Sequence, residues 1–417
     1  MSQSPWQFFA TASPAERRAL LASTLGWMLD GMDITLYAMV IAELLRELQL
    51  TPAQAGLLAS STLIASALGG ILFGVFADRA GRRRALMASI LVYSVFTAAC
   101  GLSRTLTELA LFRFLLGLGM GGEWATGAAL VAETWRAEHR GKALGLMQSG
   151  FAIGYAMAAV VTALVLPRWG WRAVFFVGLL PALVTLWIRR GVEESPLWAA
   201  QAPPSNATPR RAGRSTLFQL GLVSRYRRQI LVTLSMNTAA LFGWWGLFTW
   251  IPPYLALPEA QGGRGLTIAA SSLWIVAMQA GMWLGYVTFG FISDALGRKR
   301  TYVAYLLLAA VLVPFYARAQ APASLLLLGP IVAFFGTGHF TGFGAITAEL
   351  FPTSFRASAM GFTYNSGRAL SAAAPWLMGW VAEHRSLNSA FGIGALAFLL
   401  AGLLATALPE TKSRVLA

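Results

Sequence analysis

Twelve long apolar stretches constrain the fold of this 417-residue chain more than any other feature. Each holds about 20 residues or more, enough for a helix rising 1.5 Å per residue to cross a hydrocarbon core of about 30 Å. A helix satisfies its own backbone hydrogen bonds in lipid. We therefore predict an all-α membrane protein with twelve transmembrane helices. The stretches lie near residues 20–45, 54–76, 84–103, 105–132, 141–166, 171–189, 229–256, 267–292, 299–317, 323–347, 357–382 and 388–408.

Composition agrees with a membrane protein. The chain is 57% hydrophobic and only 12% charged, about half the charged fraction of a typical soluble domain. A soluble fold is therefore excluded.

Two charged segments interrupt the apolar pattern in the same way. GVFADRAGRRRAL begins at Gly74 and GFISDALGRKR begins at Gly290. Each runs from an apolar helix through an aspartate and a glycine into a basic run, which is too charged for lipid and predicts a tight loop at a membrane surface. We call the sequence separation of the two central glycines, Gly81 and Gly297, the repeat offset. A repeat of about half the chain indicates two halves of one architecture.

The repeat offset continues beyond these loops. It aligns VAETWRAEHRGKALG with TAELFPTSFRASAMG, and so Glu133 with Glu349 and Arg140 with Arg356. We therefore predict two pseudo-symmetric six-helix bundles. The predicted segments are a cytoplasmic leader at 1–19, bundles at 20–190 and 229–408, a cytoplasmic linker at 191–228 and a cytoplasmic tail at 409–417.

The net charge of +15 reports membrane topology. If the first residue lies inside, the predicted cytoplasmic segments hold 23 of the 32 Lys and Arg residues and the outer loops hold seven. This bias follows the positive-inside rule and places both termini in the cytoplasm of a multi-pass protein of the cell (inner) membrane. It also argues against a nucleic-acid partner.

The sequence offers no set of residues for catalysis. It has one cysteine, Cys100, and three histidines, two of which (His139 and His384) fall in predicted loops. No metal cluster, partnered nucleophile or phosphate-binding loop is evident. We predict that the protein is not an enzyme and needs no cofactor or metal.

Six ionisable residues fall within the apolar stretches. A charge at the bilayer centre costs at least about 2.5–3.5 kcal/mol, so each needs a partner, a wet cavity or a proton. These residues are Asp30, Asp33, Arg113, Glu123, His339 and Arg368.

The first and fourth stretches suggest a proton-coupling group. Asp30 and Asp33 share a helix face, and either could pair with Arg113. A carboxylate that alternates between an arginine and a proton would couple transport to proton flow. The alternative is a permanent salt bridge that only joins two helices.

Glu123 lies about 15 Å along the helix from Arg113, too far for direct neutralisation. It is a candidate proton site or substrate contact, or else a buried neutral acid. The repeat offset pairs it with His339, and we expect the two to face one another across a central cavity. Histidine titrates near neutral pH, although a lone buried histidine can also be a packing residue.

Arg368 is the candidate substrate anchor, because a guanidinium binds a carboxylate with two hydrogen bonds. The alternative is pairing with a distant carboxylate of the protein. Polar and aromatic side chains in other apolar stretches add candidate substrate contacts. These are Asn365, Tyr364, Gln148, Tyr155, Asn237, Trp245 and Gln279.

The repeated loops and the acids and arginines after them are candidate gating residues. Such charges would bind helix ends or one another and latch the cytoplasmic face in one state. They are Asp78, Arg82, Glu133, Arg140, Asp294, Arg298, Glu349 and Arg356.

These motifs together resemble the major facilitator superfamily over essentially the whole chain. The two repeated loops look like its signature loop, and RFLLGLG at 113–119 looks like its helix 4 motif. VEESPLW and LPETK are similar to the sugar-porter branch. LDGMDITLY and GLGMGGEWATGAALVAE look closer to the sialate/lactate and aromatic-acid proton symporters.

The resemblance implies two six-helix bundles, a central site and alternating access. It also implies that Asp30 or Asp33 acts with Arg113 in proton coupling. SMNTAALFGWW in the seventh stretch lacks the glutamine-rich pattern of sugar porters, which argues against a hexose substrate.

We therefore predict a monomeric, proton-coupled symporter that imports a small organic anion, such as a lactate-like monocarboxylate or sialate. The main alternatives are a sugar or polyol porter and an aromatic-acid porter. A drug/proton antiporter would use exposed acids such as Glu123 rather than Arg368. A transporter-like nutrient sensor would require a cytosolic signalling domain, for which the segment 190–228 is too short.

Overall fold

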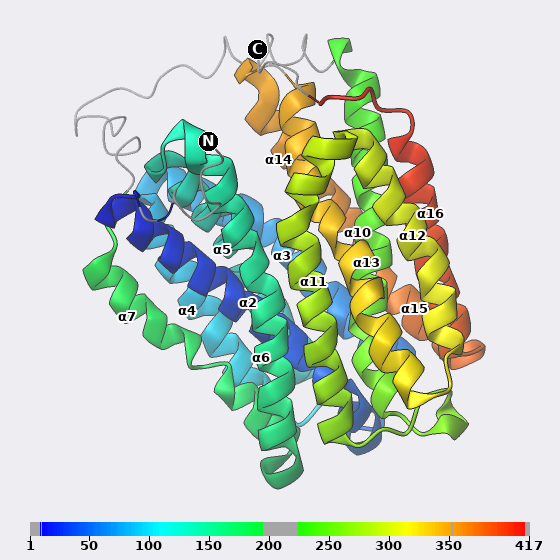
Figure 1. Ribbon diagram of the computed structural model, residues 1–417. Coiled ribbons are helices and arrows are strands. Elements are labelled where there is room, and N and C mark those ends of the chain that lie inside the picture. The colour runs from blue at the N-terminus through cyan, green and yellow to red at the C-terminus, as the bar shows by residue number, and fades with distance from the viewer. Residues whose placement is uncertain (1–8, 10, 195–223, 352, 413–417) are drawn as a thin grey trace. The chain divides into compact units, whose positions relative to one another are not determined.

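The computed structural model describes residues 9, 11–194, 224–351 and 353–412. Within these ranges the chain folds into helices joined by short turns, and no strand occurs (Figure 1). Nine helices of this described part are long and apolar enough to cross a membrane. The predicted leader and linker lie largely outside it.

The chain divides into two compact units. Unit 1 comprises Met1–Leu50 and Ser61–Ala202, and unit 2 comprises Thr51–Ser60 and Pro203–Ala417. The first turns of one helix, α3 (Pro52–Ala80), are therefore grouped with unit 2.

Two helices of unit 1, α2 and α5, begin at strong N-capping residues. Ser13 and Thr105 each form a capping box with a glutamate three residues later, which satisfies backbone donors that a helix start leaves open. α2 packs against α5 and α6, and α4 packs against α5 and α7. The helices are α2 (Pro14–Glu47), α3 (Pro52–Ala80), α4 (Arg82–Cys100), α5 (Leu106–Thr134), α6 (Ala137–Val177) and α7 (Pro181–Gly191).

α2 begins six residues before the predicted first span. The fifth and sixth predicted spans meet inside α6 at Gly170, whose φ of 73° is not helical. α6 then ends at Val177, and the sixth span continues as α7.

Unit 2 is built in the same way. α10 packs against α14 and α16, α11 against α13, and α12 against α13 and α16. The predicted eleventh span is divided between α14 and α15. The helices are α10 (Arg227–Ala256), the 3-10 turn η1 (Glu259–Gln261), α11 (Ile268–Leu296), α12 (Arg298–Arg318), α13 (Pro322–Leu350), α14 (Thr353–Ser371), α15 (Ala373–His384) and α16 (Leu387–Ala405).

The helix boundaries keep the register of the sequence repeat. α3 and α11 both have 29 residues, and α5 and α13 also have 29. The two helices of each pair begin one repeat offset apart, as the sequence predicts. Gly81 and Gly297 separate consecutive helices with φ of 102° and 105°, a conformation that favours glycine. The predicted two-part helical fold is confirmed.

Glycines bring helices together at equivalent places in the two units. A Cβ at Gly69 of α3 would lie 2.0 Å from the carbonyl oxygen of Leu118 on α5. At the equivalent Gly285 of α11, a Cβ would lie 2.5 Å from the carbonyl oxygen of Phe334 on α13. Small residues permit such close packing where lipid supplies no hydrophobic drive for helix association.

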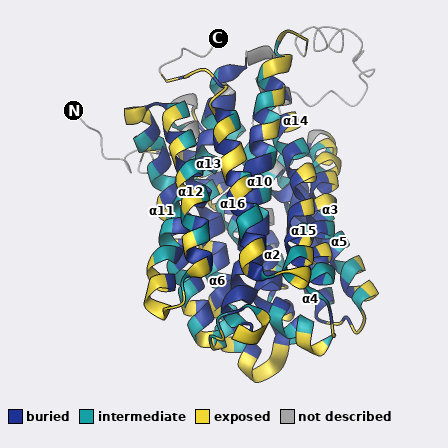
Figure 2. Ribbon diagram, turned by 90° about the vertical axis from the view of Figure 1, so that its right-hand side faces the viewer, coloured by how far each residue is buried: buried dark blue, intermediate teal, exposed yellow. Residues whose placement is uncertain are grey.

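Individual helices carry both buried and exposed stripes (Figure 2). Many exposed positions hold large apolar residues such as Leu57, Ile71 and Leu327, which are 55%, 63% and 68% exposed. This is the surface expected of helices that face lipid.

Candidate functional site

One face of α2 carries the buried acids of unit 1. Gly26, Asp30, Asp33 and Tyr37 follow one another at intervals of four, three and four residues, which places them on a single helix face. All four are buried, and both aspartates have no exposed surface. We call these four residues the acidic stripe of α2.

Glu123 of α5 packs against one end of the acidic stripe. A Cβ at Gly26 would lie 2.4 Å from Glu123 Oε1, so the glycine makes room for the carboxyl group. Neither oxygen of Glu123 has a hydrogen-bond partner among the described residues. Asp30, one turn along the stripe from Gly26, lies within electrostatic range of Glu123.

Arg113 lies at the other end of the acidic stripe. Its guanidinium carbon is 3.7 Å from the centroid of the Tyr37 ring, and its side chain is 1% exposed. A desolvated contact of this kind stabilises by about 2 kcal/mol or more. Arg113 and Asp33 both lie within electrostatic range of Cys100. The exchange of an aspartate between Arg113 and a proton stays a prediction.

α4 supplies the partners of Asp33. The Thr97 hydroxyl lies 3.0 Å from Asp33 Oδ2 and 2.8 Å from the carbonyl oxygen of Tyr93. Tyr93 itself lies within electrostatic range of Asp30, Asp33 and Glu123. Unit 1 therefore holds three carboxyl groups in one buried cluster between α2, α4 and α5.

Arg368 is buried in unit 2 and is 3% exposed. No ion pair is present for it within the described part of the chain, and its Nε has no hydrogen-bond partner there. Tyr364 lies one turn before it on α14 and within electrostatic range. Asn365 donates to the Gly361 carbonyl at 3.0 Å.

Asn237 joins α10 to α14 beside Arg368. Its Nδ2 donates to the carbonyl oxygens of Thr363 at 3.2 Å and Tyr364 at 3.4 Å. A Cβ at Gly367 would lie 2.5 Å from the same nitrogen. Because both amide protons are used by backbone carbonyls, Asn237 positions α14 in this conformation.

An aromatic cluster lies further along α10, two turns after Asn237. The Trp244 ring stacks on Phe248 with centroids 5.1 Å apart and meets Trp245 and Phe340 edge-on at 4.6 and 5.6 Å. Phe340 also contacts Tyr286 of α11 at 6.3 Å. Trp245 Nε1 is buried without a partner among the described residues.

Gln279 and His339 present further polar atoms in unit 2. Both amide atoms of Gln279 and both ring nitrogens of His339 are buried and have no hydrogen-bond partner among the described residues. His339 stacks on Phe340 at 4.5 Å and meets Tyr302 edge-on at 5.8 Å. These ring contacts agree with a packing role, and the expectation that His339 faces Glu123 stays a prediction.

Two predicted substrate contacts lie on α6 in unit 1. Gln148 Oε1 accepts a hydrogen bond from Trp124 Nε1 at 3.1 Å. Tyr155 has no exposed surface. Their roles as substrate contacts stay predictions.

The predicted gating residues of unit 1 meet at helix ends. Arg82 at the start of α4 donates to Glu133 at the end of α5, with Nε and Nη2 at 3.2 and 3.1 Å from Oε1. Arg83 Nη1 donates to the Val192 carbonyl at 3.1 Å. The side chains of Asp78 and Arg140 lie outside the described residues.

The equivalent residues of unit 2 form the same contact. Arg298 Nε lies 3.4 Å from Glu349 Oε1, and its Nη1 lies 2.6 Å from Asp294 Oδ1. The side chain of Arg356 is outside the described part.

Two glutamates outside the predicted set of gating residues complete these clusters. Glu194 accepts the backbone N–H of Arg83 at 3.1 Å, and Glu410 accepts that of Arg298 at 2.8 Å. Their carboxyl groups also lie against the left-handed glycines Gly81 and Gly297. Glu194 and Glu410 are separated by the repeat offset, which could therefore have found them in VEESPLW and LPETK.

The fold and these buried charges define a class of protein, a multi-pass helical carrier made of two repeated units. A family model described as Major Facilitator Superfamily matches residues 24–261 and 254–416. The chain belongs to this superfamily of membrane transporters and is not an enzyme.

Several relatives named as transporters match nearly the full length of the chain. A Cupriavidus pinatubonensis protein named as a probable 4-methylmuconolactone transporter is 32% identical, covering 97% of this chain and 93% of its own. The sialic acid transporter NanX of Escherichia coli is 31% identical, with coverage of 94% and 93%. The cis,cis-muconate transport protein of Acinetobacter baylyi is 29% identical, with coverage of 93% and 92%.

A solved structure shows the same fold. The partially occluded, inward-open xylose transporter XylE of E. coli aligns with a TM-score of 0.76 over 97% of this chain and all of its own. Its sequence identity is 20%, so the likeness concerns the fold alone.

Proposed function

We propose that the chain is a proton-coupled symporter that imports a small organic carboxylate, with unsaturated and aromatic acids as its preferred substrates. The observation that carries this proposal is the buried cation Arg368. Among the described residues Arg368 has no ion-pair partner, and a guanidinium buried in a membrane protein needs a counter-charge. A substrate carboxylate supplies that charge with two parallel hydrogen bonds.

The aromatic cluster supports a planar substrate. Trp244, Trp245 and Phe340 offer ring faces and edges against which a planar conjugated acid can pack. The relatives named for 4-methylmuconolactone, muconate and sialic acid point to carboxylic acids, and two of these substrates are unsaturated. Lactate-like acids remain a weaker candidate, because a small saturated acid would leave these rings uncovered.

The three buried carboxyl groups of unit 1 support coupling to protons. Glu123 has no hydrogen-bond partner among the described residues, so a proton is the simplest way to neutralise it. The Thr97 hydroxyl has one proton and two neighbouring acceptors. If the Thr97 hydroxyl donates its proton to the Tyr93 carbonyl, its oxygen can only accept from Asp33, and Asp33 must then be protonated to donate that hydrogen bond.

The proposed setting is the bacterial cell (inner) membrane with both termini in the cytoplasm. The excess of Lys and Arg in the predicted cytoplasmic segments supports this orientation. Reporter fusions to the C-terminus that are active only in the cytoplasm would test it, and activity only outside would reverse it.

The test is uptake by cells or proteoliposomes containing the full chain, with labelled benzoate, muconate, niacin, sialate, lactate and xylose. We expect uptake of one or more unsaturated or aromatic acids, driven by an inward proton gradient. Arg368→Ala should abolish that uptake, and Arg368→Lys should leave a small part of it because Lys lacks the planar fork. A matched control is Arg318→Gln, which changes an exposed arginine at the end of α12.

A second candidate, a sugar or polyol porter, is supported by VEESPLW and LPETK. Uptake of xylose that Arg368→Ala leaves unchanged would select it and contradict the carboxylate proposal.

A further inference from the structure

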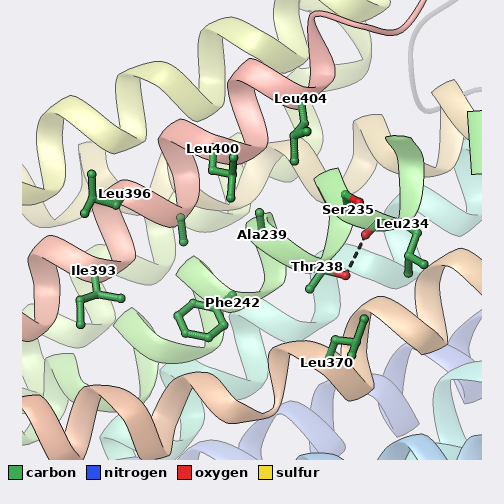
Figure 3. A pocket seen from close by; sticks show the side chains of 11 residues that line it. Leu234, Ser235, Thr238, Ala239, Phe242, Leu370, Ile393, Leu396, Leu400 and Leu404 are labelled. Atoms are coloured by element: carbon green, nitrogen blue, oxygen red, sulfur yellow. Dashed lines mark hydrogen bonds between the residues drawn. The ribbon is translucent and has the colours of Figure 1, made fainter. Parts of the chain in front are cut away.

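An apolar groove of about 500 Å³ runs along the outside of unit 2. It is formed by α10, α14 and α16 (Figure 3). Leu234, Thr238 and Phe242 line it from α10, and Leu396 and Leu400 line it from α16. The residues that line it carry no charged side chain.

The groove is exposed although its walls are apolar. Leu396, Leu400 and Leu370 are 65%, 52% and 59% exposed. α10 and α16 are both long and apolar enough to cross a membrane. In a bilayer, such a groove on the surface of spanning helices is filled by hydrocarbon chains rather than water.

The length of the groove fits one lipid leaflet. Along α10 the groove runs from Leu234 to Phe242. Figure 3 shows Leu404 of α16 at the Leu234 end and Ile393 of α16 at the Phe242 end. Eight residues of helix correspond to about 12 Å. One leaflet of the hydrocarbon core is about 15 Å thick, so the groove accommodates most of one acyl chain.

Two arginines mark the end of the groove nearest the membrane surface. Arg227 and Arg228 begin α10, and both are exposed. They precede Leu234 and Ser235 by seven residues, two turns of helix, and therefore lie on the same face about 10 Å beyond the groove. The intervening Leu231 is 61% exposed on that face.

The charges around this end favour an anion. Within the described part of the chain, α16 contains no charged residue along Leu387–Ala405. The nearest formal charges on the groove-bearing face of α10 are the two arginines. An acyl chain in the groove would place its headgroup phosphate at the level of Arg227 and Arg228.

We propose that this groove binds one acyl chain of an anionic phospholipid, whose phosphate pairs with Arg227 and Arg228. The site is separate from the proposed substrate site at Arg368. Its occupancy therefore does not depend on which substrate is carried.

The test is native mass spectrometry of the full chain, purified in detergent and mixed with equal amounts of phosphatidylglycerol and phosphatidylcholine of the same chain length. We expect preferential retention of phosphatidylglycerol. A basic residue near a membrane surface contributes about 1 kcal/mol toward an anionic lipid. Arg227→Gln and Arg228→Gln should thus each weaken retention about fivefold, while the double variant R318Q/R385Q, at exposed arginines elsewhere, should not.

The acyl chain is tested separately from the headgroup. Ala397→Trp fills the groove and should reduce retention of phosphatidylglycerol, whereas Val311→Trp, at a 56% exposed position of α12, should not. Equal retention of both lipids by the parent chain and by every variant would overturn the proposal. A dimer that Ala397→Trp disrupts would also overturn it, because a second copy would then occupy the groove.

Discussion

Alanine at Gly69 should destabilise the protein, whereas alanine five residues further along the same helix should not. A Cβ at Gly69 would lie 2.0 Å from the Leu118 carbonyl oxygen, and ordinary contact begins at 3.4 Å. α3 and α5 would therefore have to separate by about 1.4 Å, because a backbone carbonyl cannot turn away as a side chain can. Overpacking of this kind costs about 1–3 kcal/mol.

The repeat supplies a second test and two matched controls. At the equivalent Gly285 the contact is 2.5 Å, so Gly285→Ala should be less harmful than Gly69→Ala. Gly74 and Gly290, which the repeat offset also pairs, have nothing within 4 Å of an added Cβ. Alanine at either should be neutral or stabilise by up to about 1 kcal/mol, since glycine is a poor helix residue.

The assay is unfolding of each purified variant in detergent micelles, followed by tryptophan fluorescence against denaturant concentration. The expected order of stability is Gly69→Ala lowest, then Gly285→Ala, then the parent chain, with Gly74→Ala and Gly290→Ala equal to or above it. The helix packing would be refuted if Gly74→Ala were as destabilising as Gly69→Ala, or if Gly69→Ala had no effect.

Three further predictions concern polar contacts. Thr97→Val should lower the free energy of unfolding by about 1–3 kcal/mol, because it removes the hydroxyl beside the buried Asp33 carboxyl group; Thr97→Ser should restore most of it in the same unfolding assay. Partial burial tends to raise the pKa of Glu410, but the backbone N–H groups of its neighbours outweigh this and hold the pKa below its usual value. The ionised Glu410 therefore stabilises the folded protein at pH values above the usual pKa of a glutamate, and this stabilisation is lost as pH falls through the lowered pKa. Glu410→Gln should remove this pH-dependent part of the stability, as measured by melting curves taken between neutral and acidic pH. Arg82→Lys should weaken the contact with Glu133 by about 1 kcal/mol, since Lys cannot reproduce the two donors of the guanidinium, and no change in the denaturation midpoint would contradict that reading.

The fold followed from the sequence because its main signals are local. Apolar run length predicts spanning helices, and the repeat offset predicts equivalent helices in two units. Glycines at positions 81 and 297 marked the turns because a left-handed backbone favours that residue. Helix ends were less predictable, since α2 extends beyond its apolar core through the Ser13 capping box.

The candidate site was predictable only as a set of residue types. Buried charges stand out in an apolar sequence, so Asp33, Glu123 and Arg368 were found. The partners of Asp33 and Arg113 were not found, because Thr97 and Tyr37 are ordinary residues whose role depends on which helices meet. Glu194 and Glu410 carried a usable signal, because the repeat offset pairs them within VEESPLW and LPETK.

Proteoliposomes with a trapped pH indicator can show whether a carboxylate and a proton cross the membrane together. With the preferred acid supplied outside and no proton gradient imposed, we expect internal acidification that accompanies substrate entry. Glu123→Gln should abolish this acidification while preserving exchange of labelled for unlabelled acid. Substrate entry without any pH change in the parent chain would rule out proton-coupled symport.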